Sequence, residues 1–280
     1  MPRLASHRAA RAPAWVCVPV MVVLWVFVAS TLPFIPGCQG LTPGKMASVQ
    51  TTSDAPRAGN VYMVRGLIGV FSTGVDTLCQ RLDEAGVNAH VFQDDQNYSL
   101  SKSLIERYAG KTDSREPLVL VGHSYGADSV VRIARRLDEH DIPIDLLITL
   151  DATTPPSVPK NVRRCVNYFQ SQPTDVIPLF RGIPLKPDKD AAGKVDLVNM
   201  DLRKDRKDLL ESGTNHINID KNTKVHQDVV KQVAAVCVPR EHWAAGRKGA
   251  APVAPTSAPV RVASPKTPAP VPATRPVSLR

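Results

Sequence analysis

One serine of this chain stands in a setting that suits nucleophilic chemistry. Ser124 is the middle residue of Gly-His-Ser-Tyr-Gly, which follows the apolar run Leu-Val-Leu-Val and precedes a segment with helical periodicity. A serine hydroxyl is a weak nucleophile, so it needs a neighbouring base and a position clear of the surrounding backbone. A sharp turn from a strand into a helix provides that position, and Gly122 and Gly126 leave room for the turn. A glycine-rich turn whose serine only caps a helix is the alternative interpretation.

The elements that must position this turn alternate along residues 59–240. Short apolar or alternating segments predict strands at residues 60–65, 88–92, 118–121, 144–150, 165–169 and 195–199. Segments with apolar residues at helical spacing predict helices at residues 75–85, 100–108, 127–137 and 223–236. This alternation predicts an α/β fold with an open, mostly parallel sheet and helices on both faces.

In this context, residues 60–237 resemble the α/β-hydrolase superfamily, and within it the small serine hydrolases of the lipase, esterase and thioesterase type. The resemblance implies a catalytic triad in the chain order nucleophile, acid, histidine, with Ser124 as the nucleophile. It also implies an oxyanion hole made by two backbone N–H groups. These belong to Tyr125, directly after the serine, and to Leu67, in the loop after the first strand. The connections are too short for a large cap domain.

Two aspartates are candidates for the acid of the triad. Asp151 directly ends the strand-like segment IDLLITLD, which would hold it rigidly, and LDATTPP resembles the stretch that carries the acid in pancreatic-type lipases. Asp175 follows the next predicted strand, which is the commonest place for the acid in the superfamily. We favour Asp151 and leave Asp175 open.

The base is expected in the loop before the last predicted helix. His216 lies there, in the Gly- and Asn-rich segment SGTNHINIDKN, and the superfamily places its histidine at this point. His226 is the second candidate. Because it falls one residue after Val225 in an amphipathic helix, we expect its side chain to face solvent.

These residues predict a serine hydrolase that cleaves carboxylic esters or thioesters through an acyl-enzyme. Its substrate would be a small ester or thioester, or a lipid presented by a membrane. Residues 176–193 would form either an apolar wall of the site or an ordinary loop. No cofactor or metal is expected, since no metal, nucleotide or flavin motif occurs. The other class is a non-catalytic binding protein of the cell envelope, because fold alone does not establish catalysis.

The N-terminal residues 1–38 predict export. Three arginines precede residues 12–35, which carry no charge and are long enough to cross a bilayer, and the arginines should stay cytoplasmic. The segment Ile-Pro-Gly-Cys, ending at Cys38, resembles the lipobox of bacterial lipoproteins, although Pro36 departs from the usual small residue. We expect the domain to be tethered on the periplasmic side of a bacterial membrane, through a lipidated Cys38 or through an uncleaved anchor.

Two further segments lack a folding pattern. Residues 39–58 predict a linker, and residues 241–280 predict a disordered, Pro- and Ala-rich tail that carries much of the net charge of +9. No nucleic-acid-binding motif accompanies this basic charge, so we interpret the tail as solvated. The sequence gives no indication of the oligomeric state. Three cysteines in residues 59–240 leave one over for any disulfide.

Overall fold

The computed structural model describes residues 44–66, 72–111, 115–171 and 181–249, and it confirms the predicted fold class. Six strands form one sheet, and every neighbouring pair is parallel. The sheet has the order β2-β1-β3-β4-β5-β6. The strands are β1 (Asn60–Val64), β2 (Asn88–Phe92), β3 (Leu118–His123), β4 (Leu146–Leu150), β5 (Arg164–Phe169) and β6 (Asp196–Asp201).

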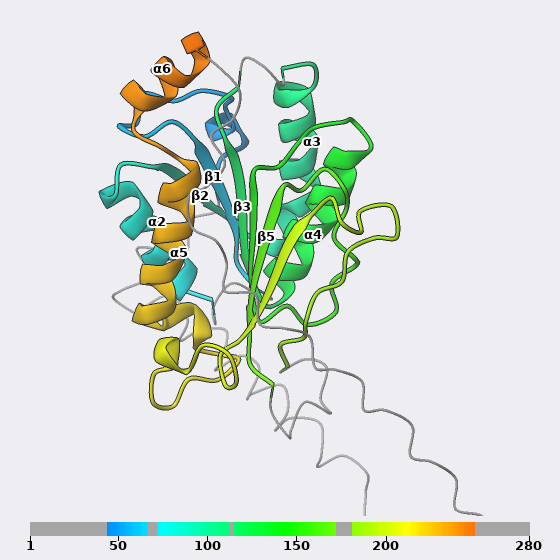
Figure 1. The fold of residues 1–280 in the computed structure, drawn as a ribbon, viewed down its shortest axis with the longest axis vertical. Coiled ribbons are helices and arrows are strands. Elements are labelled where there is room, and N and C mark those ends of the chain that lie inside the picture. The colour runs from blue at the N-terminus through cyan, green and yellow to red at the C-terminus, as the bar shows by residue number, and fades with distance from the viewer. Residues whose placement is uncertain (1–43, 67–71, 112–114, 172–180, 250–280) are drawn as a thin grey trace, which may run out of the picture.

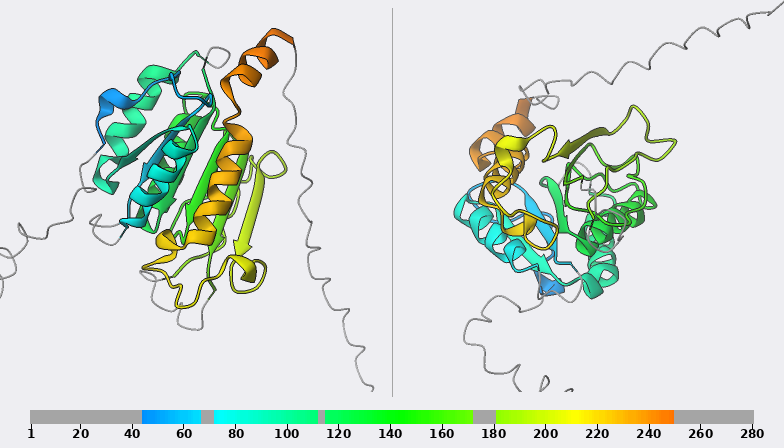
Figure 2. Two further views of the ribbon diagram at one scale, coloured as in Figure 1. Left: turned by 90° about the vertical axis from the view of Figure 1, so that its left-hand side faces the viewer. Right: turned by 90° about the horizontal axis from the view of Figure 1, so that it is seen from below.

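Helices cover both faces of the sheet (Figure 1). Helices α2 (Gly74–Glu84) and α5 (Thr223–Val236) lie on one face, and α3 (Asn97–Tyr108) and α4 (Tyr125–Asp138) lie on the other. Two views at right angles show the same layers (Figure 2). Short 3-10 helices are η2 (Met46–Ser48), η3 (Asp94–Gln96), η5 (Lys207–Leu209) and η6 (Ile219–Lys221).

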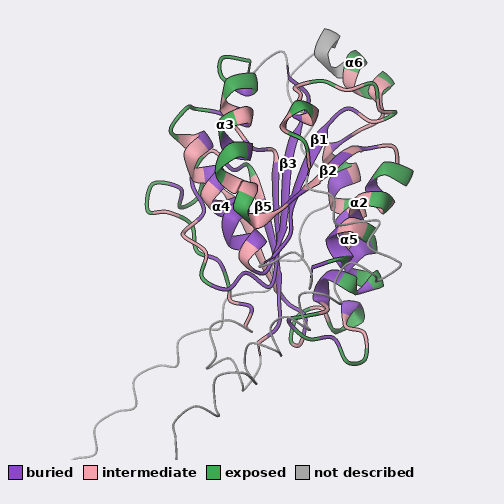
Figure 3. Ribbon diagram, turned by 180° about the vertical axis from the view of Figure 1, so that it is seen from behind, coloured by how far each residue is buried: buried purple, intermediate pink, exposed green. Residues whose placement is uncertain are grey.

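The central strands are buried on both sides, as Figure 3 shows. In β1, Val61 and Met63 pack toward α2 and α5, whereas Tyr62 and Val64 pack toward α3 and α4. Because side chains alternate between the faces of a strand, both sets must be apolar in a central strand. The uninterrupted apolar runs of the sequence therefore follow from this two-sided burial.

The strand order reverses between β1 and β3. From β1 the chain crosses to β2 at one edge, and then returns past β1 to β3 and continues toward the other edge. In open parallel sheets, ligands bind at the carboxyl ends of the strands where the order reverses in this way. The loops after β1 and β3, which carry Gly66 and Ser124, meet at that point.

The predicted linker is wrong for residues 44–58, which belong to the folded domain. Val49 is fully buried, and the Gln50 carbonyl accepts hydrogen bonds from the hydroxyls of Tyr62 and Tyr108. Arg57 donates to three backbone carbonyls, those of Ala85, Ala234 and Cys237. A polar segment can be held by side-chain bonds to distant backbone, and composition alone does not reveal such bonds.

The predicted tail also begins too early, because helix α6 (Arg240–Gly249) continues the folded chain. Its first residue, Arg240, donates to the carboxylate of Glu116 at 2.6 Å and to the carbonyl of Ala55 at 2.9 Å. These bonds join the start of α6 to residues 44–58. Residues 250–280 lie outside the described residues.

The cysteines of the domain form no disulfide with one another. Cys79, Cys165 and Cys237 are free, and burial raises the pKa of the Cys79 and Cys237 thiols to about 12. Within the described ranges, no helix is long and apolar enough to cross a membrane, and no separate cap domain is present. The predicted anchor at residues 12–35 and Cys38 lie outside those ranges.

Candidate active site

Ser124 lies on the sharp turn between β3 and α4, as the glycine spacing predicts. Its backbone has φ 56° and ψ −124°, a conformation that non-glycine residues rarely adopt. A Cβ at Gly122 would lie 2.3 Å from the carbonyl oxygen of Gly126, and a Cβ at Gly126 would lie 2.2 Å from that of Val64. Only glycine fits at these two positions, so the turn depends on both.

The structure brings three of the predicted residues together. The Oγ of Ser124 lies 2.9 Å from Nε2 of His216, and Nδ1 of His216 lies 3.5 Å from Oδ2 of Asp151. All three side chains are buried. In structures without a substrate, such bonds are often longer than in the reacting complex. The histidine is placed to take the serine proton, and the carboxylate is placed to stabilise the imidazolium that forms.

Asp151 is held by backbone on the strand beside it. Its own N–H donates to the carbonyl of Tyr168 at 2.8 Å, and its φ is 48°. The N–H of Gln170 donates to Oδ1 at 2.9 Å, and a Cβ at Gly182 would lie 2.0 Å from that oxygen. Sequence reasoning missed Gln170 and Gly182, because neither belongs to a recognisable motif. Asp175, the other candidate acid, lies outside the described residues.

Asp128 joins the segment after Asp151 to helix α4, which follows Ser124. This fully buried carboxylate accepts from the N–H and hydroxyl of Thr153, at 2.9 and 2.7 Å, and from the N–H of Thr154 at 2.9 Å. Asp128 belongs to the first turn of α4, directly after Ser124. The Asp-Ala-Thr-Thr segment therefore keeps a fixed place relative to the serine.

The segment that carries His216 is attached to the start of α2. Oδ2 of Asp220 accepts from the N–H of Gly74 at 2.9 Å, and a Cβ at Gly74 would clash with the Asp220 backbone. Burial raises the pKa of Asp220 to about 7, against the lowering effect of that N–H. Nε2 of His226 contacts the Asp220 carbonyl, and the residue is 1% exposed. The expectation that His226 faces solvent is therefore wrong, since the turn before α5 folds back over it.

One of the two predicted oxyanion donors lies within the described residues. Tyr125 is the first residue of α4, so its N–H has no partner within the helix and lies at the positive end of the helix dipole. Leu67 lies outside the described residues. Its neighbour Gly66 passes close to the nucleophile, because a Cβ there would lie 3.1 Å from Cβ of Ser124. Among the described side chains, no cluster is arranged to hold a metal ion.

The turn at Ser124 sits at the point where the order of the parallel strands reverses, and Asp151 and His216 follow it in that chain order. An open parallel sheet with a serine, an aspartate and a histidine in this order is the arrangement that the resemblance to the α/β hydrolases implies. No family model matches the chain, and no curated protein matches it.

Solved structures similar to this chain carry the names of hydrolases. They include a cutinase-like protein from Cryptococcus sp. with 14% identity, covering 65% of this chain and 96% of that chain, at a TM-score of 0.38. Est1E from Butyrivibrio proteoclasticus shows 15% identity, 65% and 90% coverage and a TM-score of 0.35. YbtT, a type II thioesterase from the yersiniabactin pathway, shows 10% identity, 66% and 95% coverage and a TM-score of 0.37.

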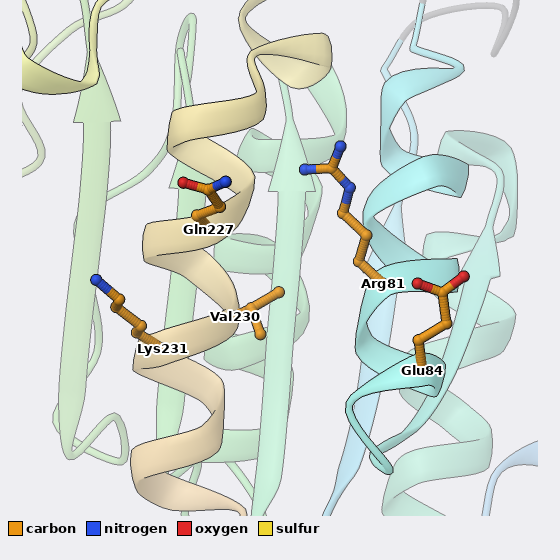
Figure 4. Close-up of a pocket in the computed structure, with 5 residues that line it drawn as sticks. All are labelled: Arg81, Glu84, Gln227, Val230 and Lys231. Atoms are coloured by element: carbon orange, nitrogen blue, oxygen red, sulfur yellow. The ribbon is translucent and has the colours of Figure 1, made fainter.

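A surface groove between α2 and α5 is separate from this site. It is lined by Arg81 and Glu84 of α2 and by Gln227, Val230 and Lys231 of α5 (Figure 4). None of these residues belongs to the cluster around Ser124. Four of the five side chains are charged or polar, and we assign no substrate to the groove.

We predict that Asp220→Asn changes how stability depends on pH. Because the pKa of Asp220 is raised on folding, the folded protein takes up a proton between about pH 4 and pH 7. The stabilisation that comes from this bound proton is full below pH 4 and is lost as the pH rises through 7. The free energy of unfolding of Asp220→Asn, relative to that of the wild type, should therefore rise by roughly 1 kcal/mol or more between pH 5 and pH 8.

Urea unfolding at the two pH values measures this difference. Asp95→Asn, on an exposed residue, is the matched control for the loss of one carboxylate. If the free energies of unfolding of Asp220→Asn and the wild type differ by the same amount at pH 5 and pH 8, the raised pKa of Asp220 is contradicted.

Proposed function

We propose that this protein is a serine hydrolase that cleaves carboxylic esters or thioesters, with Ser124, His216 and Asp151 as its triad. The observation that carries the proposal is the 2.9 Å contact between Ser124 Oγ and His216 Nε2 at a strained turn. A serine that only capped a helix would not need this contact, and Ser124 makes no side-chain cap bond to α4.

The proposed reaction has two steps. His216 accepts the proton of Ser124 as Oγ attacks the acyl carbon, and the N–H of Tyr125 stabilises the oxyanion. His216 then gives the proton to the leaving alcohol or thiol, so that an acyl-enzyme remains. Water, deprotonated by His216, attacks this acyl-enzyme, and His216 returns the proton to Ser124 Oγ as the carboxylic acid leaves. Asp151 stabilises the charged imidazole in both steps.

We predict that Ser124→Ala and His216→Ala each lower kcat/KM for p-nitrophenyl butyrate by a factor of about 10³ or more, because members of a triad act as a unit. Asp151→Asn should lower it by a factor of about 10² to 10⁴. The exposed residues supply matched controls, His140→Ala and Asp95→Asn, whose rates should equal that of the wild type.

Two outcomes would contradict this proposal. A folded wild type that hydrolyses no p-nitrophenyl ester from acetate to laurate, and no acyl thioester, would favour the non-catalytic envelope-binding class. Full activity in Asp151→Asn would instead remove Asp151 from the triad and make Asp175 the acid.

We also propose that the domain is exported and tethered to the bacterial membrane through residues 1–38. The basic start and the apolar residues 12–35 support this. The described chain begins at Gly44, whose carbonyl accepts from Gln96 Nε2 at 3.0 Å, beside the carboxyl end of β2. Gly44 thus lies at the same ends of the parallel strands as Ser124, which would suit a substrate presented by the membrane.

Cell fractionation tests the tether. We predict that the full chain sediments with membranes and is released by detergent but not by alkaline carbonate, as expected of an acyl chain or a spanning helix. If Cys38 is lipidated, Cys38→Ala should remove the mass of the acyl groups from the peptide that contains residue 38. If the anchor is uncleaved, the mass of that peptide should change only by the difference between cysteine and alanine. A full chain found in the soluble fraction would contradict the proposal.

A further inference from the structure

The histidine of the Gly-His-Ser-Tyr-Gly segment contacts the residue proposed as the base. His123 ends β3, and its ring is 2% exposed. Its Nε2 lies 2.9 Å from the backbone carbonyl oxygen of His216, and its Nδ1 lies 2.8 Å from Oγ of Ser72. The two histidine rings lie 5.6 Å apart, centroid to centroid. Neither contact is visible in the sequence, where His123 occupies a variable position of the turn.

These partners determine where the proton of the His123 ring sits. A backbone carbonyl only accepts, so Nε2 carries the hydrogen and donates it to His216. Nδ1 is then an acceptor, and the hydroxyl of Ser72 donates to it. The Oγ of Ser72 in turn accepts from the N–H of Gly66 at 3.0 Å. One neutral tautomer therefore satisfies all three bonds in a single direction, from Gly66 through Ser72 and His123 to His216.

The surroundings favour this neutral ring. Burial lowers the pKa of His123 to about 4, and the bond to the His216 carbonyl opposes that effect only in part. The other groups that act on the ring are the His216 ring, the carboxylate of Asp151 and Lys221. Oδ2 of Asp220 also lies 4.0 Å from Nδ1. A protonated ring would place a hydrogen on Nδ1 and remove the acceptor of the Ser72 hydroxyl.

We propose that His123 is a positioning residue for the reaction, which holds His216 in line with Ser124 by binding its backbone carbonyl. The inference rests on the proposed function of Ser124 and His216. The chain of bonds joins the loop after β1, the nucleophile turn and the segment of the base, three segments that are far apart in sequence. A displacement of about 1 Å in such a site can cost a factor of about 10² in rate, so the bond acts on kcat.

Three variants separate positioning from packing. His123→Gln keeps an N–H donor near the place of Nε2, whereas His123→Leu keeps bulk and loses the donor. Ser72→Ala removes the partner of Nδ1. With p-nitrophenyl butyrate, His123→Leu should lower kcat by a factor of about 10 to 100 with KM within threefold of the wild type. His123→Gln should recover kcat to within about threefold of the wild type.

The double variant Ser72→Ala/His123→Leu tests whether the bonds act as one chain. If they do, Ser72→Ala alone should lower kcat, but the double variant should have nearly the same kcat as His123→Leu, because the effects of coupled residues do not add. Equal kcat values in His123→Leu and His123→Gln would overturn the proposal, as would losses in both that simply follow their melting temperatures.

A second readout does not depend on turnover. Long-range ¹H–¹⁵N spectra of the imidazole groups should show the proton of His123 on Nε2 at neutral pH. In His123→Leu, the ¹⁵N shift of His216 Nε2 should move toward its value in Ser124→Ala, and in His123→Gln it should stay at the wild-type value. An unchanged shift in His123→Leu overturns the positioning role. A wild type that shows these shifts but hydrolyses no ester contradicts only the proposed function.

Discussion

The site depends on hydrogen bonds that continue the sheet past the last residues of its strands. The N–H of Ser124 donates to the carbonyl of Leu150 at 2.9 Å, and the N–H of Asp151 donates to the carbonyl of Tyr168 at 2.8 Å. Ser124 and Asp151 are therefore each bonded, through the backbone N–H, to the adjacent strand. Their separation follows from the roughly 4.8 Å spacing of neighbouring strands rather than from loop conformation. The segment that carries His216 then has to bring this residue to the positions that the sheet sets for Ser124 and Asp151.

The same two residues carry unusual backbone, and the structure compensates for it locally. Ser124 and Asp151 both have positive φ, a conformation that costs about 1 to 3 kcal/mol in a non-glycine residue. Such strain persists only where the surroundings fix it. The close approach of Gly126 to β1 holds the backbone of Ser124 in place. The bond from the N–H of Gln170, and the absence of a side chain at Gly182, hold that of Asp151. Local preference is thus overruled at the two positions where the chemistry is proposed.

The sequence predicts the sheet, four of its helices and the Ser124–His216–Asp151 cluster because these features have local signals. Strands buried on both faces are continuous apolar runs, and the strained turn requires glycines at fixed spacing. Long-range contacts have no such signal. The burial of His226, the contacts of His123 and the packing of Val49 all depend on segments far away in the chain. The 3.5 Å distance between Asp151 and His216 likewise depends on segments far apart in the chain, and Asp175 lies outside the described residues.

Covalent labelling of the full chain with a fluorophosphonate, followed by peptide mass spectrometry, tests directly whether Ser124 is an activated nucleophile. This probe reacts with an activated serine, so the natural substrate does not have to be known. We predict one phosphonyl group on the peptide that contains Ser124, and none on the same peptide of His216→Ala. A folded wild type that stays unlabelled, or that carries the label on another serine, would contradict it.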